Sequence, residues 1–369
     1  MNQVGEFKAR LAQAQASVAN QELAAMLLIP GASMRYLTGY DALLLERLTC
    51  LVVLGDDVAP VLVVPALERP AAVASGVVEL GIDITSWQET DDPYAAIAQL
   101  LPASGVIAVD NHMWAETLLR LKGSMPDINH TLAGSIVDEL RVRKSASELE
   151  ALRDAGAAID RVHARMSTWL TVGRSEREVG RDIAAAIIEE GHVSVDFVIV
   201  ASGPNGASPH HEVSDRIIEA GDVVVVDIGG TTPLGYCSDS TRTYAMGSVD
   251  PDFARSYTAL MASQEAAFQA ATIGATAESI DAAARSVLTA AGLGEVFIHR
   301  TGHGIGMSTH EEPYIVSGNR TPIQPGMAFS IEPGFYVEGQ WGARLEDIVI
   351  MTPQGCERVN HRPRELVIL

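Results

Sequence analysis

Cysteine and long apolar runs are scarce in this sequence. Its three cysteines, Cys50, Cys237 and Cys356, are odd in number and far apart along 369 residues. Such spacing does not provide a disulfide framework. The N-terminal stretch has no signal-type apolar core, and no window approaches the roughly eighteen apolar residues of a membrane span. We therefore expect a cytoplasmic protein with no membrane partner.

Positive charge is also scarce. The sequence has 26 Lys and Arg against 47 Asp and Glu, a formal net charge of −21, and no basic cluster offsets this surplus. An acidic surface repels the phosphates of nucleic acids and anionic lipids. We therefore expect no nucleic-acid partner. Solubility alone explains most of the carboxylates. A functional role for a particular carboxylate therefore has to be argued from its position in the sequence.

Two common functional motifs are absent. His310 is followed by Glu-Glu-Pro-Tyr, so the sequence lacks the His-Glu-x-x-His motif of zinc peptidases. The glycines of residues 302–306 do not have the G-x-G-x-x-G spacing and do not open a βαβ unit, which excludes a dinucleotide loop there.

The length and a change in residue pattern along the chain predict two domains, because a single hydrophobic core rarely grows beyond about 250 to 300 residues. Residues 1–136 combine an amphipathic helix over 7–20 with short β-rich runs that alternate with helical ones, which predicts a mixed α/β domain. The charged segment 137–150 has a strongly helical pattern and marks a boundary between Ile136 and Ser147. Residues 145–369 form the predicted second domain. The β-rich runs begin at Met26, Thr49, Val61 and Val106.

The second domain contains an internal repeat. A predicted helix follows Ser175 and ends near Gly191, and a similar helix follows Thr276 and ends near Gly292. Ser and Thr are favoured N-caps, and Gly is favoured just past a helix C-terminus. Each half also has a histidine and then an acid in the same order: His210 and Asp227, then His310 and Glu332. We infer an α+β domain of two similar halves related by a pseudo-two-fold axis.

Four carboxylates occupy matching places in the two halves. Asp227 follows four valines, and Asp239 lies twelve residues further on across a short turn. Glu332 and Glu346 lie fourteen residues apart across another turn. Four carboxylates on two facing hairpins repel one another unless cations lie between them. A bound pair of metal ions is the most economical explanation.

A histidine adds a nitrogen ligand to this oxygen-rich set. His303 lies between Gly302 and Gly304, which allow a close approach of the backbone. Oxygen ligands with one imidazole suit Mn²⁺ or Co²⁺ best, and Zn²⁺ or Fe²⁺ are also possible. Two such ions about 3.5 to 4 Å apart can activate a water molecule and polarise a carbonyl, which is the chemistry of hydrolysis.

The five residues and their contexts resemble the pita-bread metallopeptidases, the family of methionine aminopeptidase, aminopeptidase P and Xaa-Pro dipeptidase (prolidase). The matching stretches are Val-Asp227-Ile-Gly, Ser-Asp239-Ser-Thr-Arg-Thr, Thr-Gly-His303-Gly-Ile-Gly, Glu332-Pro-Gly and Arg-Leu-Glu346-Asp. The resemblance covers residues 145–369 and implies a pita-bread catalytic domain after a smaller creatinase-like N-terminal domain. It also implies the ligand assignment: Asp227 on one ion, Asp239 and Glu346 bridging both, His303 and Glu332 on the other.

The resemblance implies roles for residues beside the ligands. It implies that His210 lies near the scissile bond and that His310 orients the substrate carbonyl or the tetrahedral intermediate. It also implies that His299 does not bind metal itself but lies next to the residues that do. Glu332 is our candidate for accepting the proton of the attacking water. Arg344 shares a strand face with the nearby ligand by period-two alternation. Its partner is a ligand carboxylate, the C-terminal carboxylate of the substrate, or a purely structural acid.

The extra N-terminal domain, which contains Tyr36-Leu-Thr-Gly-Tyr, is similar to the proline-specific branch of this family, and the length is similar to that of Xaa-Pro dipeptidases. We therefore expect a dinuclear metal-dependent hydrolase of the Xaa-Pro bond that acts on dipeptides. The alternatives are an aminopeptidase P that acts on longer peptides, a C–N hydrolase or lyase of the same fold, and a non-enzymatic peptide-binding module. The resemblance implies small peptide substrates and a homodimer.

Overall fold

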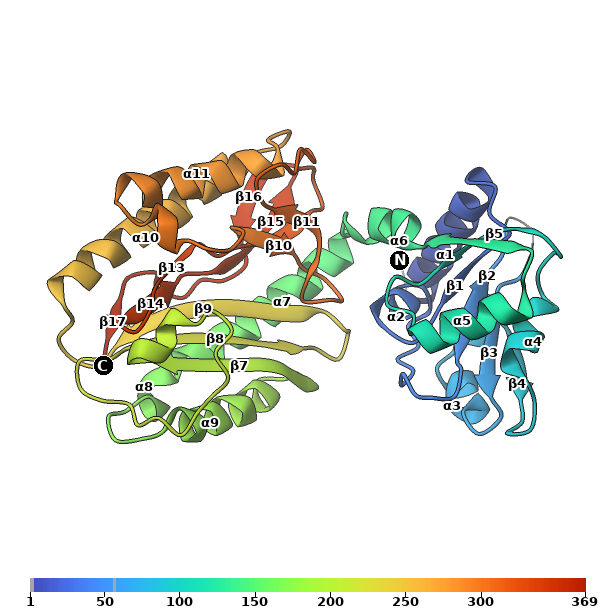
Figure 1. The fold of residues 1–369 in the computed structure, drawn as a ribbon, viewed down its shortest axis with the longest axis horizontal. Coiled ribbons are helices and arrows are strands. Elements are labelled where there is room, and N and C mark those ends of the chain that lie inside the picture. The colour runs from blue at the N-terminus through green and yellow to red at the C-terminus, as the bar shows by residue number, and fades with distance from the viewer. Residues whose placement is uncertain (1–2, 56–57) are drawn as a thin grey trace. The chain divides into compact units, whose positions relative to one another are not determined.

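The computed structural model describes residues 3–55 and 58–369. The chain divides into two compact units, Met1–Arg141 and Val142–Leu369 (Figure 1). Both units combine helices with a β-sheet, so the predicted mixed organisation in two domains is confirmed. Across the described ranges no helix is long and apolar enough to cross a bilayer.

The N-terminal unit is built on a six-stranded sheet in the order β4-β3-β2-β1-β5-β6. Strand β2 pairs antiparallel with β1 and β3, and the other neighbours pair in parallel. Three strands at the centre, Ala25–Leu28, Cys50–Val53 and Val61–Pro65, are apolar runs rich in Val and Leu with every residue buried, which is typical of strands covered on both faces. The strands are β1 (Ala25–Leu28), β2 (Cys50–Val53), β3 (Val61–Pro65), β4 (Asp83–Trp87), β5 (Gly105–Val109) and β6 (Ile128–Leu132). The helices are α1 (Gln3–Asn20), α2 (Ala32–Thr38), α3 (Arg69–Ala74), α4 (Pro93–Ala98), α5 (Ala115–Ser124) and α6 (Gly134–Arg141), with a 3₁₀ turn η1 (Val77–Leu80).

The C-terminal unit packs its long helices against two sheets and a hairpin (Figure 1). One sheet has the order β17-β9-β8-β7, the other β11-β10-β12-β15-β16, and β13 pairs with β14. The helices are α7 (Ala146–Ala164), α8 (Met166–Trp169), α9 (Glu176–Glu189), α10 (Pro251–Ala270) and α11 (Ala277–Ala290), with 3₁₀ turns η2 (Gly203–Ala207) and η3 (Gly294–Val296). The strands of the first sheet are β7 (Ser194–Ser202), β8 (Val223–Thr231), β9 (Cys237–Ala245) and β17 (Val367–Ile368). The remaining strands are β10 (Gly302–Gly304), β11 (Glu311–Ile315), β12 (Ala328–Ile331), β13 (Gly334–Val337), β14 (Trp341–Arg344), β15 (Asp347–Thr352) and β16 (Gly355–Arg358).

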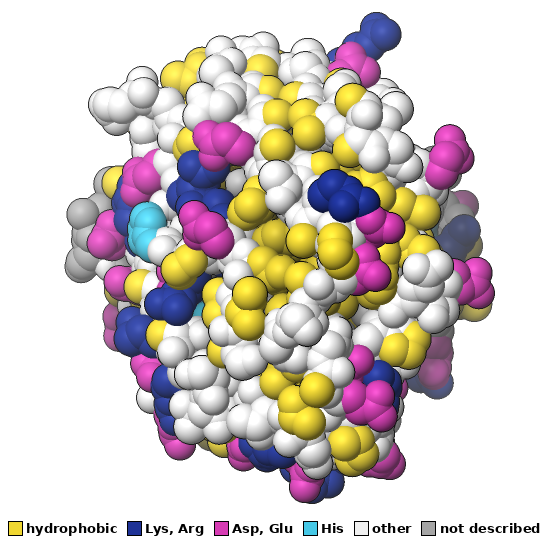
Figure 2. All heavy atoms as spheres, turned by 90° about the vertical axis from the view of Figure 1, so that its left-hand side faces the viewer, with side chains coloured by type: hydrophobic (Ala, Val, Ile, Leu, Met, Phe, Trp, Pro, Cys, Tyr) yellow, Lys and Arg dark blue, Asp and Glu magenta, His cyan; other side chains and the backbone are white. Residues whose placement is uncertain are grey.

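Apolar side chains are also prominent on part of the surface. On the face of the C-terminal unit shown in Figure 2, they gather over the centre, and charged side chains lie mainly toward its edges. Contiguous apolar surface of this kind is a common mark of an interaction site.

The internal repeat is visible in the backbone. Helices α9 and α11 each follow a residue that makes an isolated antiparallel bridge further along its own half, Ser175 with Ile217 and Thr276 with Pro322. Both helices also end before a glycine in the left-handed region, with φ of 106° at Gly191 and 77° at Gly292. The two halves therefore match in the bridge before each helix and in the left-handed glycine after it, and the predicted pseudo-two-fold repeat is confirmed.

The segment 137–150 is helical on both sides of a break, and the break falls inside the predicted boundary region. Helix α6 ends at Arg141 and α7 starts only at Ala146. Ser145 forms a capping box, in which its Oγ accepts from the Glu148 amide and the Glu148 carboxylate accepts from the Ser145 amide. A serine followed three residues later by glutamate starts a new helix, and this local signal ends the helical pattern.

The two repeated caps allow a matched stability test. Ser175 forms a capping box with Glu178, whereas the side chain of Thr276 makes no cap hydrogen bond within the described chain. We expect Ser175→Ala to lower the free energy of unfolding of the C-terminal unit by about 1 kcal/mol. Thr276→Ala should cost clearly less. Thermal unfolding of both variants measures the difference, and equal losses would contradict this account of the caps.

Candidate metal centre

A cavity of about 1210 Å³ lies within the C-terminal unit. Its walls come from both halves of the repeat, and every site residue that the sequence suggested lines it. The candidate metal ligands there are Asp227, Asp239, His303, Glu332 and Glu346. The other candidates there are His210, His299, His310 and Arg344.

The first pair of acids comes from the hairpin of β8 and β9. In its register Gly229 is opposite Asp239 and Asp227 is opposite Thr241. Asp227 and Asp239 are therefore diagonal neighbours on one face of the sheet, rather than directly opposed residues. Both side chains are buried.

The second pair comes from a hairpin whose ladder is interrupted at the acids themselves. Glu332 follows β12 and Glu346 precedes β15. The pairs on either side, Ile331 with Asp347 and Gly334 with Arg344, share one register, which places Glu332 opposite Glu346. The two hairpins are joined at Thr241, whose Oγ1 donates to Glu346 Oε2 at 2.7 Å and whose carbonyl accepts from the Glu346 amide at 3.2 Å.

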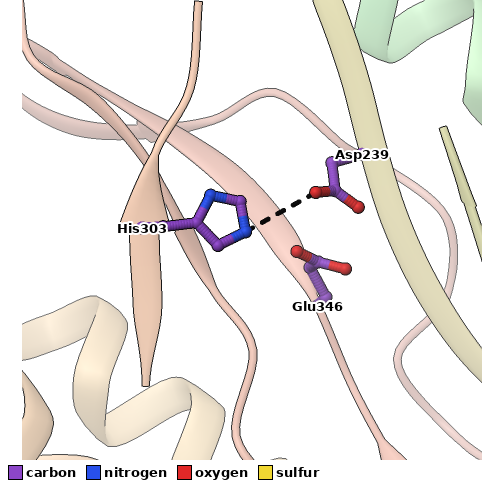
Figure 3. A group of neighbouring side chains, drawn as sticks. All are labelled: Asp239, His303 and Glu346. Carbon is purple, nitrogen blue, oxygen red and sulfur yellow. Dashed lines mark ion pairs between the residues drawn. The ribbon is translucent and has the colours of Figure 1, made fainter. Parts of the chain in front are cut away.

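Strand β10 brings His303 to these acids. Its flanking glycines are required by close packing, because a Cβ at Gly302 would lie 1.9 Å from the Ser330 carbonyl oxygen. The imidazole Nε2 lies 3.1 Å from Glu332 Oε1. It also lies 3.6 Å from Asp239 Oδ2 (Figure 3). Nδ1 lies 3.1 Å from the Gly304 carbonyl oxygen. In the tautomer that donates from Nδ1 to this carbonyl, the Nε2 lone pair points at the carboxylates, as in a metal-binding histidine.

The arrangement fits a divalent cation. Ligand atoms of Asp239, His303 and Glu346 all lie within 4.8 Å of one another (Figure 3). Asp227 Oδ1 and Glu346 Oε1 are buried and have no hydrogen-bond partner among the described residues. Burial, together with the negative charge of neighbouring carboxylates, raises the pKa of Asp239 and of Glu346 well above the usual range. A cation would relieve both the repulsion and the unsatisfied oxygens.

Two further residues have clear charge states. Burial alone would raise the pKa of Glu332, but the hydrogen bond and charge of His303 lower it to about 2, so this carboxylate is ionised at neutral pH. Burial, followed by the charges of His303 and Arg300, lowers the pKa of His310 to about 4. His310 is therefore neutral at pH 7, and its ring lies 4.1 Å from that of His303, centroid to centroid.

Among the three alternatives for Arg344, the structure shows a ligand carboxylate. Its guanidinium is buried and pairs with Asp227. Its Nη1 also donates to the Tyr336 hydroxyl at 2.9 Å, and that hydroxyl lies 2.8 Å from His299 Nε2. A continuous chain of polar contacts thus connects His299 to Asp227. The sequence analysis did not identify Tyr336 as a site residue. Its position next to Arg344 follows from the pairing of β13 with β14, in which Gly334 is opposite Arg344 and Tyr336 is opposite Gly342.

A second residue missed by the sequence reasoning is Glu176, at the start of α9. Its carboxylate is fully buried and accepts hydrogen bonds from four residues of the segment 202–214, which carries His210. The donors are the amide and hydroxyl of Ser202, Asn205 Nδ2, His211 Nε2, and the amide and hydroxyl of Ser214. Burial opposes ionisation, but these hydrogen bonds outweigh it and lower the pKa of Glu176 to about 2. Glu176 therefore fixes the wall of the cavity around His210.

Comparison with known proteins identifies the family. The model described as metallopeptidase family M24 matches residues 150–353, and the model described as creatinase/prolidase N-terminal domain matches residues 10–143. The chain belongs to metallopeptidase family M24. It is therefore a metallopeptidase that acts on peptides, in a family that uses divalent metal ions, and its fold is the creatinase-type N-terminal domain followed by the pita-bread domain.

Relatives of this M24 metallopeptidase span nearly its whole length. A probable dipeptidase PepE of Mycobacterium tuberculosis is 51% identical over 364 residues, which are 98% of this chain and 96% of that protein. The Xaa-Pro dipeptidase of Lactobacillus helveticus is 34% identical and covers 90% of this chain and 92% of its own. The crystal structure of dipeptidase PepE from Mycobacterium ulcerans has a TM-score of 0.94 at 49% identity and covers 99% of this chain and 98% of its own.

The role of Glu176 predicts a defined effect of its neutral isostere. In Glu176→Gln a side-chain amide group replaces one accepting oxygen and faces donors, so we expect a stability loss of about 2 kcal/mol or more. We also expect faster amide hydrogen exchange in residues 202–214. Glu189→Gln on the same helix removes an exposed carboxylate and serves as the control. Unchanged exchange in that segment would contradict the anchoring role.

The low pKa of Glu176 also predicts a pH dependence. A carboxyl group whose pKa falls from 4.5 to about 2 on folding stabilises the fold above its unfolded pKa. This stabilisation is lost as the pH falls through the folded pKa. The stability difference between the wild type and Glu176→Gln should therefore narrow between about pH 4.5 and about pH 2. Denaturant unfolding at several pH values measures it, and a constant difference would contradict the assignment.

Proposed function

We propose that this M24 metallopeptidase is an Xaa-Pro dipeptidase with two divalent metal ions. The observation that carries the proposal is the convergence of one imidazole and four carboxylates in one cavity. Asp227, Asp239, His303, Glu332 and Glu346 would hold the ions. This donor set favours Mn²⁺ or Co²⁺, with Zn²⁺ or Fe²⁺ as further candidates. The similarity to a protein named Xaa-Pro dipeptidase supports the substrate class.

The metal ions would supply a Lewis acid for the carbonyl and an activated water molecule. The chain supplies the groups around them. Glu332 is ionised and can accept a proton from the attacking water. His310 is neutral and can donate a hydrogen bond to the substrate carbonyl, and His210 lines the same cavity, where it would lie near the scissile bond. His299, Tyr336 and Arg344 hold Asp227 in place.

The chemistry of the Xaa-Pro bond explains why metal ions and histidines suit its cleavage. This bond is a tertiary amide without an N–H, so it cannot donate the backbone hydrogen bond by which many peptidases bind an extended substrate. Cleavage then depends on activating the carbonyl and protonating the leaving nitrogen. Neutral His310 and His210, which both line the cavity, would serve these needs.

A second candidate function is that of an aminopeptidase P. The cavity of about 1210 Å³ exceeds the roughly 300 to 1,000 Å³ of ordinary small-molecule pockets. It therefore has room for a peptide longer than two residues. This observation makes the length of the substrate the main point to test.

We further propose a homodimer that acts in the cytoplasm. The apolar side chains gathered at the centre of the face in Figure 2 support an association surface. The three cysteines are all free, which suits a reducing compartment.

Release of proline tests the function directly. Protein treated with a chelator should release no proline from an Xaa-Pro dipeptide, and added Mn²⁺ should restore the release. An Xaa-Pro-Yaa tripeptide should be cleaved far more slowly. Cleavage of the tripeptide alone would favour aminopeptidase P instead, and metal-dependent activity on neither substrate would contradict both proposals.

Substitution of single ligands tests the metal site. We expect Asp239→Ala and His303→Ala to lower both bound metal and kcat/KM, the latter by at least about 100-fold, because each removes a side chain from the centre. Glu219→Gln changes an exposed carboxylate of the same unit and serves as the control. Metal content by mass spectrometry and proline release are the measurements. Wild-type values of both in either ligand variant would show that the assignment is wrong.

A further inference from the structure

His310, the residue proposed to bind the substrate carbonyl, is held in place only indirectly. Its imidazole lies against the ring of His303, with the two ring planes at 75° to each other. Within residues 3–55 and 58–369 this imidazole makes no hydrogen bond. The orientation of the ring therefore depends on the backbone that carries it and on the contacts that fix this backbone.

The next residue, Glu311, anchors that backbone in the interior of the C-terminal unit. Its carboxylate Oε1 lies 2.6 Å from Nζ of Lys144, and the side chains of the acid and the lysine are 9% and 1% exposed. Lys144 is itself fixed in place. Its amide donates to the Gly326 carbonyl at 2.7 Å, and the following residue, Ser145, caps helix α7. The Glu311 carboxylate thus meets a cation whose backbone cannot easily shift.

The turn between His303 and His310 is shaped around Glu311. A Cβ added at Gly306 would lie 2.5 Å from Glu311 Oε1, and a Cβ added at Gly304 would lie 2.6 Å from the Glu311 carbonyl oxygen. Gly304 is also the partner of Glu311 in the pairing of β10 with β11. Glu311 therefore packs both its main chain and its side chain against the residues that follow the metal-site histidine.

Stability alone does not explain a buried ion pair of this kind. Desolvation of the two charges opposes their attraction, and apolar residues of similar volume commonly stabilise a fold equally well. What the pair adds is direction, because the Glu311 carboxylate keeps the one position in which it meets the Lys144 ammonium group. Both residues lie outside the lining of the cavity. Any effect of the pair on the reaction therefore passes through the neighbouring His310.

We propose that Lys144 is a positioning residue for His310, which it fixes through the ion pair with Glu311 so that the imidazole reaches the substrate carbonyl. This inference rests on the proposed Xaa-Pro dipeptidase function, in which His310 donates a hydrogen bond to that carbonyl. It adds a residue that contacts neither the substrate nor the metal site.

Removal of one charge tests the pair in the metal-loaded enzyme. In Lys144→Met the Glu311 carboxylate stays in the interior without this cation, so we expect a lower Tm. We also expect kcat for an Xaa-Pro dipeptide to fall on the order of 10- to 100-fold, with wild-type metal content and a smaller change in KM. Lys144→Arg, which keeps the charge, should recover part of kcat. Wild-type kcat in Lys144→Met would overturn the proposal.

The double variant Lys144→Met with Glu311→Leu separates positioning from stability. It buries neither charge, so Tm should return toward the wild-type value, whereas kcat should stay as low as in Lys144→Met. Recovery of kcat together with Tm would show that the pair is purely structural and would overturn the proposal. If Lys144→Met does not fold, Glu311→Gln gives the same test with the smallest change in shape, and wild-type kcat there has the same meaning.

The ion pair of Arg153 with Glu357 provides a matched control. It also connects α7 to a strand, with Nε 2.9 Å from Oε1, but its side chains are 35% and 44% exposed and lie outside the cavity lining. The variant Arg153→Met with Glu357→Leu should keep wild-type kcat. A loss equal to that of the Lys144 double variant would overturn the proposal, because kcat would then respond to any ion pair of this helix.

Amide hydrogen exchange separates this proposal from the function on which it rests. If the wild type released no proline, the dipeptidase function would fail, but exchange in the metal-free protein would still measure the anchoring. Faster exchange of residues 304–311 in the Lys144 double variant, with unchanged exchange of residues 202–214, supports it. Equal exchange of residues 304–311 in both proteins overturns it.

Discussion

Repulsion among four carboxylates in one cavity is the constraint on which the catalytic unit depends. The structure answers it in part with its own side chains: Arg344 pairs with Asp227, and Thr241 donates to Glu346. Two buried carboxylate oxygens, one on Asp227 and one on Glu346, still lack a hydrogen-bond partner in the described chain. Protein groups thus compensate only part of the charge, and the remainder is what a pair of divalent ions would neutralise.

The backbone that carries the acids is held by a second buried network. Arg242 donates from Nη1 to the Glu346 carbonyl at 2.6 Å and from Nη2 to Asp347 at 2.7 Å, which ties β9 to the strand of the opposite half. The repeat supplies two further anchors. Glu176 on α9 fixes the segment of His210, and Asp281 on α11 fixes Thr301, two residues before His303. Buried acids with complete sets of donors thus hold the histidine-bearing segments in both halves.

Much of the centre could be predicted from sequence because its signals are local. An acid after four valines and a histidine between two glycines identified Asp227 and His303 as unusual. What could not be predicted depends on tertiary contacts. Alternation along a strand placed Arg344 beside Glu346 but left its partner open, and only the folded chain shows which acid it meets. The anchoring role of Glu176 was hidden because its donors lie some 26 to 38 residues away.

The most direct test of the central claim is anomalous diffraction from crystals soaked in Mn²⁺. The account predicts two neighbouring anomalous peaks in the cavity, coordinated by the four carboxylates and by Nε2 of His303. It also predicts that the orphaned oxygens of Asp227 and Glu346 are among the coordinating atoms. A cavity without a peak, or peaks bound only by other side chains, would contradict the claim that these acids are gathered to hold metal.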